Sequence, residues 1–404
     1  MLQDKRIVLG VTGGIAAYKA AELVRELVRR GAAVRVVMTD HACEFVRPLT
    51  FETLSGNPVA TELFHLTGDH KIDHIALADF AELVVIAPAT ANIIGKLAAG
   101  IADDLLTTVL LAATAPVLIC PAMNAKMYGN PVVKENVARL SARGYAILEP
   151  ACGELACRTE GQGRLPEVPE IAEEIESLLS PKNLRGEHIL ITAGPTQEPF
   201  DPVRYITNHS SGKMGYALAV MARRRGADVT LISGPTELPA PRGVHFVPVQ
   251  TALAMRDSVL DHLKEATVVI KAAAVADYRP TVCRTTKIKK SEERMTVHLE
   301  RNPDIIATVG KKKGSRIVVG FAMESDHLLE NARAKLREKR MDFIVANDLT
   351  APGAGFRTDT NIIRILDREG GDDTFPLMGK LDAAGIILDR VKKVRDDKRA
   401  RDGH

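Results

Sequence analysis

A pair of glycines ends the first apolar run of the chain, in VTGGIAAYK at 11–19, where a strand would pass into a helix. Backbone N–H groups and the positive end of that helix can then face an anion such as a phosphate, and Thr39, after the next apolar run, could add a hydroxyl. The spacing is not the G-x-G-x-x-G of dinucleotide-binding turns, so the loop does not indicate NAD. A structural glycine turn explains it about as well as a phosphate site does.

Two side chains in the first half could handle a proton or a carboxylate. His74 can take up a proton near neutral pH, although a lone histidine in an apolar segment is more often structural. Asn124, in PAMNAKMYGNP at 121–131, could hold a carboxylate or an amide without adding charge.

The cysteines do not form a recognisable framework. Their number is odd and their spacing irregular, which disfavours a set of disulfides, so a functional cysteine would act as a reactive thiol. Cys152 and Cys157 lack the second cysteine or histidine pair that a zinc site needs. The five cysteines are Cys43, Cys120, Cys152, Cys157 and Cys283.

In the second half of the chain, lysines are the side chains that could bind phosphate groups. Gly212-Lys213 resembles part of a P-loop, but Met214 replaces the required Ser or Thr and no glycine stands five residues before Gly212. The KIKK run at 287–290, and Lys335 with Lys339 at helical spacing, would by themselves indicate solvated surfaces.

The elements that must position these residues alternate along the chain. Short apolar runs, read as strands, are separated by amphipathic segments of helix length, which predicts the α/β class with mainly parallel sheets. We expect two Rossmann-like three-layer domains, because RRGAAVRVVMT at 29–39 is echoed by RRGADVTLIS at 224–233. The predicted strands are 6–11, 34–38, 83–87, 117–120 and 146–148, then 188–192, 229–232, 268–270, 317–321 and 343–346.

A breaker segment, SPKNLRGE at 180–187, separates the two cycles and predicts domains at 1–180 and 186–404. In the second cycle the first strand–helix turn is expanded into GPTQEPFDPVRYITNHSSGKMG, which suggests a functional loop. The last residues, 395–404, are expected to be a solvated tail.

Bulk composition excludes several classes. The chain has 404 residues, 46% apolar and 26% charged, with a net charge of +3, which gives little support for a nucleic-acid surface. A membrane span is not expected because no stretch of about 18 consecutive apolar residues occurs. The start lacks a signal-peptide pattern, which favours a cytoplasmic location.

The motifs of the first half, taken in order, resemble the flavin-dependent cysteine decarboxylases, and among them phosphopantothenoylcysteine decarboxylase. They are GGIAAYK, HIALA at 74–78, APATAN with IADDLLTT, PAMNAKMY, and ACRTEGQGRL at 156–165. The resemblance implies that His74 is a base, that Asn124 holds the substrate carboxylate and that Cys157 donates a proton. Arg158 departs from the glycine that often follows this cysteine. The implied FMN-binding residues are Gly13, Gly14, Ile15, Thr39, Thr90, Ala91, Asn92, Ile93, Ala122 and Met123.

The implied chemistry suits these residues. Loss of CO2 from a plain cysteine carboxylate leaves an unstabilised carbanion, so a flavin must first oxidise the thiol to a thioaldehyde that accepts the electrons. An acid must later protonate the neighbouring carbon, which a thiol such as Cys157 can do.

The second half resembles phosphopantothenate–cysteine ligase from about 188 to about 390, through the expanded loop, AAAVADYRP, KIKK, NPDII, GFAME and ANDL. The resemblance implies that CTP and Mg2+ activate the carboxylate of 4'-phosphopantothenate for attack by cysteine, with lysines that offset the phosphate charge. Asn208 and Arg204 would contact phosphopantothenate or the acyl-cytidylate. The implied CTP-binding residues are Lys271, Ala272, Ala273, Asp277, Lys287, Pro303, Asp304, Ile305, Ile306, Phe321, Lys335 and Lys339.

Together the two resemblances imply one chain that performs both the ligation and the decarboxylation, two successive steps of coenzyme A biosynthesis. A trimeric decarboxylase and a dimeric ligase would combine into a homododecamer, in which His74 could serve the flavin of a neighbouring copy. Two alternatives are a decarboxylase of peptidyl cysteine and a flavin-binding regulatory subunit, but the ligase-like half and the complete set of His74, Asn124 and Cys157 argue against them.

Overall fold

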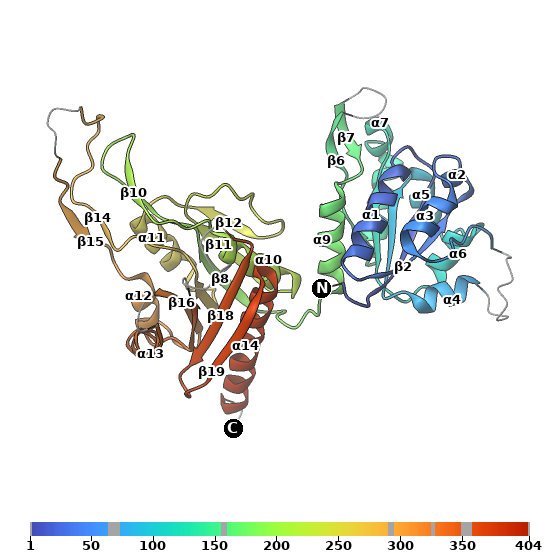
Figure 1. The fold of residues 1–404 in the computed structure, drawn as a ribbon. Helices are drawn as coiled ribbons and strands as arrows, with labels where there is room; N and C mark the ends of the chain where they lie inside the picture. Colours follow the sequence, from blue (N-terminus) through green and yellow to red (C-terminus); the bar gives the residue numbers. More distant parts are fainter. Residues whose placement is uncertain are drawn as a thin grey trace. The chain divides into compact units, whose positions relative to one another are not determined.

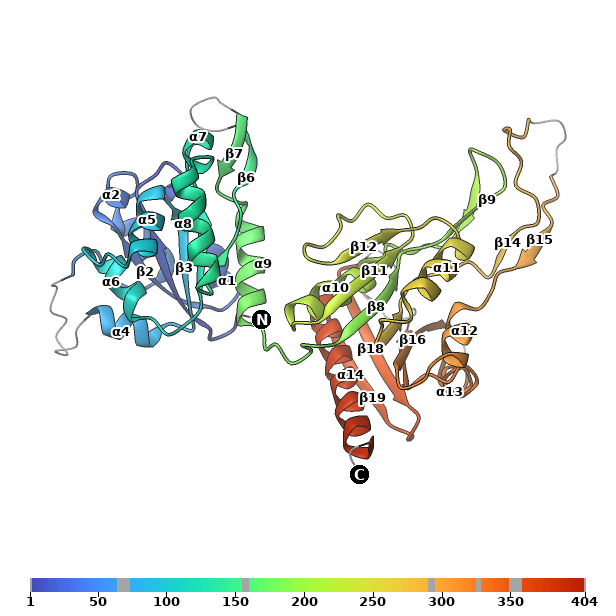
Figure 2. The same ribbon diagram turned by 180° about the vertical axis from the view of Figure 1, so that it is seen from behind.

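The computed structural model describes residues 2–63, 73–154, 160–289, 295–324, 328–348 and 358–402 (Figures 1 and 2). It divides into two compact units, Met1–Ser180 and Pro181–His404, here called unit 1 and unit 2.

Unit 1 has a parallel five-stranded sheet in the order β2-β1-β3-β4-β5. The central β3 is buried along its whole length, as expected for a strand covered on both faces. Its strands are β1 (Arg6–Val11), β2 (Ala33–Met38), β3 (Leu83–Ala89), β4 (Val117–Pro121) and β5 (Ala146–Ile147), and a hairpin of β6 (Ala151–Glu154) and β7 (Glu160–Arg164) follows.

Helices cover both faces of this sheet and so make three layers. In α1 the buried residues Ala17, Ala20, Leu23, Val24 and Leu27 recur at helical spacing and pack on one face. One face is covered by α1 (Ala17–Arg29), α3 (Pro48–Ser55) and α9 (Val168–Leu179), and the other by α4 (Asp73–Phe80), α5 (Ala91–Ala99), α6 (Leu105–Ala112) and α8 (Pro131–Ala142). The short α2 (Asp40–Cys43) and α7 (Ala125–Tyr128) follow the ends of β2 and β4.

Unit 2 has an eight-stranded sheet in the order β12-β11-β8-β13-β16-β17-β18-β19, parallel as far as β17 and antiparallel beyond it. All predicted strands are present and the predicted fold class is confirmed; β12, β18 and β19 of this sheet are additional. The strands are β8 (His188–Ala193), β11 (Asp228–Ser233), β12 (His245–Pro248), β13 (Val268–Lys271), β16 (Ile317–Glu324), β17 (Phe343–Asp348), β18 (Thr360–Asp367) and β19 (Asp372–Gly379).

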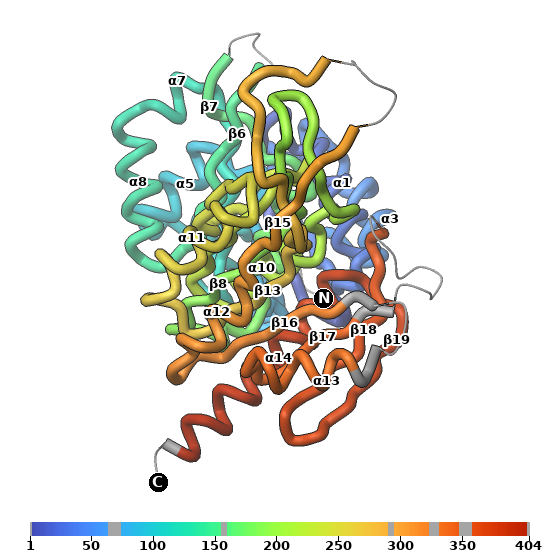
Figure 3. The backbone as a smooth tube through the Cα atoms, turned by 90° about the vertical axis from the view of Figure 1, so that its left-hand side faces the viewer, coloured from blue at the N-terminus to red at the C-terminus, as the bar shows by residue number. Residues whose placement is uncertain are grey.

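The helices of unit 2 again lie on both faces. One face is covered by α10 (Lys213–Arg224) and α14 (Lys380–Asp402), and the other by α11 (Ala252–His262), α12 (Ile305–Lys311) and α13 (Leu328–Glu338). Two hairpins, β9 (Gln197–Pro199) with β10 (Tyr205–Thr207) and β14 (Tyr278–Pro280) with β15 (Leu299–Arg301), extend beyond the sheet, with β9 in contact with β14 (Figure 3).

The expectation of a solvated tail at 395–404 is wrong as far as the described residues reach. Helix α14 continues to Asp402, and Arg395 and Arg399 both pair with Glu187, which is 2% exposed. A buried carboxylate needs such partners, so the last helix is held against the start of unit 2.

Candidate active sites

A cavity of about 710 Å³ opens in unit 1 at the carboxyl ends of β1, β3 and β4, where ligands of parallel α/β sheets bind. Four segments from distant parts of the sequence meet there. The lining residues are Gly13, Gly14, Ile15, Ala16, Tyr18, Lys19, Pro88, Thr90, Ala91, Ala122, Met123, Asn124, Met127, Glu154, Gly163, Arg164 and Leu165.

The glycine loop of this cavity can accept an anion. A Cβ atom on Gly13 would lie 2.3 Å from the Cβ of His41, so only glycine fits there without displacement. Ala16 stands at the N-cap of α1 and makes no side-chain cap. The amides of Ala17 and Lys19 already donate to the Gly14 and Ala16 carbonyls, so an anion here would be held by the amides of the glycine loop itself, beside the positive end of α1.

Hydrogen bonds join the two neighbouring loops. The Thr12 hydroxyl donates to the Pro88 carbonyl at 2.7 Å and accepts from the Thr90 amide at 3.1 Å. The ends of β1 and β3 are therefore held in a fixed relation beneath the cavity.

Asn124 occupies a defined position on the opposite wall. Its Oδ1 accepts from the Lys126 amide at 2.8 Å and so caps α7, while the Met123 amide donates to the Gly163 carbonyl at 2.9 Å. A Cβ on Gly163 would lie 2.2 Å from the Met123 oxygen, so β7 packs directly against this loop.

The structure brings together eight of the thirteen residues that the sequence assigned to this site: Gly13, Gly14, Ile15, Thr90, Ala91, Ala122, Met123 and Asn124. Three others are not among its lining residues. Thr39 caps α2, Ile93 is a core residue of α5, and Asn92 is exposed beside it.

The two proposed proton-transfer residues do not appear among the cavity's described lining. Cys157 lies outside the described residues. His74 lies in the first turn of α4, a helix that packs on α6 and β1. The buried Nδ1 of His74 has no hydrogen-bond partner within the described part of the chain.

Several lining residues were missed by the sequence analysis. Tyr18 and Lys19 lie on the first turn of α1, and Lys19 pairs with Glu167 at 3.2 Å. Their helical spacing from Ile15 was the available signal. Glu154 and Arg164 come from the β6–β7 hairpin, for which no strand was predicted.

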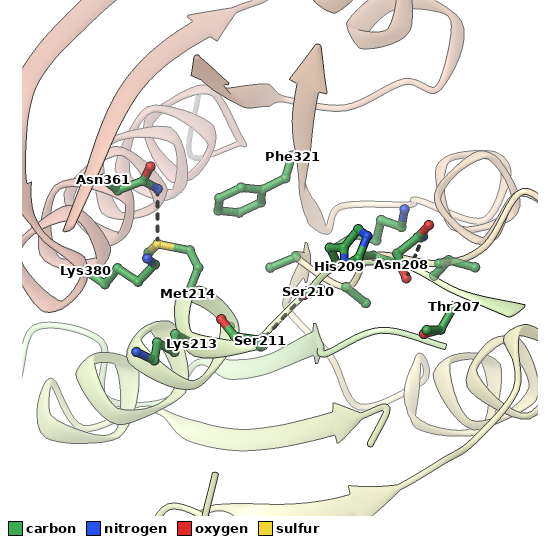
Figure 4. A pocket seen from close by; sticks show the side chains of 17 residues that line it. Thr207, Asn208, His209, Ser210, Ser211, Lys213, Met214, Phe321, Asn361 and Lys380 are labelled. Atoms are coloured by element: carbon green, nitrogen blue, oxygen red, sulfur yellow. Dashed lines mark hydrogen bonds between the residues drawn. The ribbon is translucent and has the colours of Figure 1, made fainter. Parts of the chain in front are cut away.

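The second cavity, of about 460 Å³, lies in unit 2 and is lined by the expanded loop at 207–215 (Figure 4). Asn208 and His209 lie on one side of Phe321, and Met214, Asn361 and Lys380 on the other. The remaining lining is Lys271–Val275 at the end of β13, which includes the predicted Lys271, Ala272 and Ala273. Asn208 donates to the Ala274 carbonyl at 3.2 Å.

Two lysines at this cavity were not predicted. Burial lowers the pKa of Lys380, the charge of Lys213 lowers it further, and Asp359 opposes the shift. Lys213 pairs with Asp359 at 2.6 Å. Lys213 was considered in the sequence only as part of an incomplete P-loop, and no sequence signal marked Lys380.

Most of the predicted CTP-binding charges gather around Lys271. Burial lowers the pKa of Lys271, Lys339 lowers it further, Asp304 and Asp277 oppose this, and Lys335 adds a smaller lowering. Lys339 also pairs with Asp304 at 2.8 Å.

Other predicted ligase residues are arranged differently. The Ile305 and Ile306 side chains are 4% exposed in the core, so only their backbone could face a ligand. Lys287 is exposed, and Arg204 donates to Asp201 and to the Ile288 carbonyl instead of lining the cavity. Pro303 is half-buried just before α12.

Two α/β units, each with a cavity at the carboxyl ends of its parallel strands, give this chain two candidate ligand sites, as in a two-domain α/β protein with a ligand site in each domain. The flavoprotein family model matches residues 1–180, and the model described as DNA/pantothenate metabolism flavoprotein C-terminal domain matches residues 184–394. The chain belongs to the family of coenzyme A biosynthesis bifunctional proteins. It is thus a bifunctional enzyme, with a decarboxylase of the flavoprotein type and a ligase, as the sequence predicted.

Curated relatives share almost the whole chain. The coenzyme A biosynthesis bifunctional protein CoaBC of Bacillus subtilis (strain 168) is 50% identical over 395 residues, 97% of each chain. That of Escherichia coli (strain K12) is 45% identical over 405 residues, 99% of this chain and 100% of the relative. A solved C-terminal domain of a CoaBC protein is 42% identical, with a TM-score of 0.47, and covers 54% of this chain and 99% of its own.

Two further observations concern the described residues alone. None of their helices has the length and apolar character needed to cross a membrane. Within the same ranges, no three His, Cys, Asp or Glu side chains gather in an arrangement that could hold a metal ion.

Proposed function

We propose that unit 2 uses CTP to join cysteine to 4'-phosphopantothenate through an acyl-cytidylate, and that unit 1 uses FMN to decarboxylate the resulting 4'-phosphopantothenoylcysteine to 4'-phosphopantetheine. The observation that carries this proposal is the presence of two separate cavities. One is built on a glycine loop and a helix N-terminus, and the other lies beside a cluster of lysines.

The unit 1 cavity fits FMN. Its volume of about 710 Å³ is within the usual range for cofactor sites. The N–H groups after Gly13 and Gly14 would hold the phosphate, and apolar side chains such as Ile15, Met123 and Met127 would contact the ring system. When bound, FMN supplies the two-electron oxidation and reduction that loss of CO2 from a cysteine carboxylate requires.

The protein's own groups would position the substrate and move protons. Asn124, fixed by its cap on α7, would hold the substrate carboxylate through its amide. Cys157 would protonate the carbon that has lost CO2. His74 would act as a base at the cavity of a neighbouring copy, which accounts for its position outside the lining of its own cavity.

In unit 2, a carboxylate oxygen of 4'-phosphopantothenate would attack the α-phosphate of CTP and release pyrophosphate. The cysteine amine would then attack the acyl carbon and release CMP. Lys271, Lys335 and Lys339 would offset the charge of the nucleotide, and Lys287 that of the triphosphate. Mg2+ commonly binds through substrate phosphates and one or two carboxylates, for which Asp277 and Asp304 are candidates.

We further propose a cytoplasmic homododecamer, formed by trimeric contacts of unit 1 and dimeric contacts of unit 2. The exposed apolar side chains Ile15, Tyr18 and Met127 around the unit 1 cavity support a contact between copies there.

Supplying 4'-phosphopantothenoylcysteine without CTP tests the decarboxylase separately. We expect one CO2 and one 4'-phosphopantetheine per substrate from the FMN-loaded protein. Absence of both products, with flavin bound, would favour a regulatory flavoprotein. Release of CO2 from a peptide with a C-terminal cysteine, but not from this substrate, would favour the peptidyl-cysteine alternative.

A further inference from the structure

A buried carboxylate in unit 2 links the expanded loop to the lysine segment at 287–289. Asp201 is 1% exposed and lies in the turn between β9 and β10. Its Oδ1 accepts from the amides of Val203 and Arg204, both at 2.8 Å, and these bonds close the local turn.

The other carboxylate oxygen of Asp201 accepts from the Arg204 side chain and from a residue distant in the sequence. Oδ2 accepts from Arg204 Nε at 3.0 Å, from Arg204 Nη2 at 2.7 Å, and from the backbone amide of Ile288 at 3.2 Å. Arg204 Nη2 also donates to the Ile288 carbonyl at 2.8 Å. Both backbone groups of Ile288 are therefore held by one ion pair, whose carboxylate is buried and whose guanidinium is partly exposed.

Beyond the bonds of Thr281 to the His298 carbonyl, which continue the β14–β15 pairing, little else in the described structure holds this segment. Residues 281–287 and Lys289 are exposed and belong to no helix or strand, and Ile288 alone is half-buried. The Arg284 amide donates to the Phe200 carbonyl at 3.1 Å, which is a second tie to the same hairpin. The backbone positions of Lys287 and Lys289, on either side of Ile288, thus depend on the turn at 200–204.

We propose that Asp201, acting with Arg204, is a positioning residue for ligation: it holds the 287–289 segment so that Lys287 meets the triphosphate of CTP. This inference rests on the role proposed above for Lys287. A loop that must find its position in each cycle would lose pre-organisation, so catalysis would fall even though Asp201 itself touches no substrate.

The substitution Asp201→Asn separates this role from the local turn. The amide Oδ1 can still accept from Val203 and Arg204, but an NH2 group in place of Oδ2 cannot accept from the guanidinium or from the Ile288 amide. Glu198→Gln is the matched control, because Glu198 is also buried on this hairpin and its Oε1 accepts only from the Ala252 amide among the bonds described.

The bonds by which Asp201 and Arg204 hold the 287–289 segment are here called the clamp. Hydrogen–deuterium exchange of the full-length protein tests the clamp without reference to activity. In Asp201→Asn we expect the peptide that contains 284–289 to exchange faster by about tenfold or more, while β8 and β13 keep their protection. Glu198→Gln should leave that peptide unchanged. Unchanged exchange in Asp201→Asn would overturn the clamp, whether or not the protein ligates.

Kinetics then test what the clamp does. We expect Asp201→Asn to lower the kcat/KM for CTP about tenfold or more, with kcat affected, and to add little in a Lys287→Gln background, because the two act through one group. The positioning role would be overturned if Asp201→Asn lowered kcat/KM in the Lys287→Gln background by the same factor as in the wild type. It would also be overturned if exchange showed a released segment in Asp201→Asn but kcat/KM were unchanged. A wild-type protein that forms no pyrophosphate would contradict the proposed function and not the clamp, on which exchange reports separately.

Discussion

Asn124 offers the sharpest residue-level test at the unit 1 cavity, because a substitution can change its charge and keep its structural bond. In Asn124→Asp an Oδ1 atom can still accept from the Lys126 amide and cap α7. The added negative charge would face the substrate carboxylate, and such like-charge contacts cost several kcal/mol. We expect the decarboxylation kcat/KM to fall by about a hundredfold or more, measured as CO2 release. Pyrophosphate formation by unit 2 serves as the internal control, and undiminished CO2 release would remove Asn124 from carboxylate binding.

Asp201 also predicts how stability depends on pH. Burial would raise the pKa of its carboxyl, but hydrogen bonds from the Val203, Ile288 and Arg204 amides and from the Arg204 side chain lower it to about 2. A carboxyl whose pKa is lower in the folded state stabilises the protein fully above its unfolded pKa of about 4, and this contribution is lost as the pH falls toward 2. We expect Asp201→Asn to flatten the acid side of the unit 2 stability curve, measured by urea unfolding. Parallel curves for the variant and the wild type would contradict this assignment.

At the scale of elements, the glycine loop between β1 and α1 depends on the absence of a side chain at Gly13. Gly13→Ala would place a Cβ 2.3 Å from the His41 Cβ and so displace the loop or α2. We expect the purified variant to lose most of its flavin, measured by absorbance, and its decarboxylation with it. Gly95→Ala is the control, since its Cβ would meet nothing closer than 3.9 Å within α5. Full flavin content in Gly13→Ala would show that this loop does not form the phosphate site.

The elements that the sequence predicted well are those with a strong burial pattern. The run LVVIAPA of β3 is apolar along its whole length, so this strand was predicted close to its true bounds. The regular apolar stripe of α1 likewise agrees with the helix expected after the glycine pair. The hairpins β9–β10 and β14–β15 consist of three-residue strands, which are too short to show a clear burial pattern. The end of α14 was expected to be a solvated tail because its charged residues gave no hint of the buried Glu187 that pairs with Arg395 and Arg399.

At the candidate sites, too, some residues could be predicted from the sequence and others could not. Residues on contiguous motifs, such as Gly13, Gly14 and Ala122–Asn124, were placed at one cavity because strand ends of a parallel sheet meet there. The pairing of Asp201 with Ile288 joins residues 87 positions apart, and spacing along the chain says nothing of it. The pairing of Arg204 with Asp201 was not predicted either, and the substrate contact expected for Arg204 stays a prediction.

At the scale of the whole molecule, two cavities in two compact units predict that each reaction can be lost separately. We expect Cys157→Ser to stop product formation at an oxidised intermediate, and Lys287→Gln to slow ligation. Mixing the two full-length variants should restore 4'-phosphopantetheine production, because the ligated intermediate can leave one protein and enter the other. Failure of the mixture, although each variant retains its other activity, would indicate that the intermediate is not released.

The assembly adds a second prediction at this scale. If His74 serves the cavity of a neighbouring copy, a variant that stays monomeric should lose decarboxylation, because its own cavity lining does not include His74. Sedimentation combined with CO2 release measures this. A monomer with full decarboxylase activity would contradict the shared site.

The central claim is that one chain performs both reactions in sequence. The direct measurement is a single incubation of the purified, FMN-loaded protein with 4'-phosphopantothenate, cysteine, CTP and Mg2+, in which pyrophosphate, CO2 and 4'-phosphopantetheine are counted together. We predict equal amounts of all three, with pyrophosphate appearing first. Pyrophosphate without CO2 would contradict the decarboxylase half of the claim, and the absence of both would contradict the whole of it.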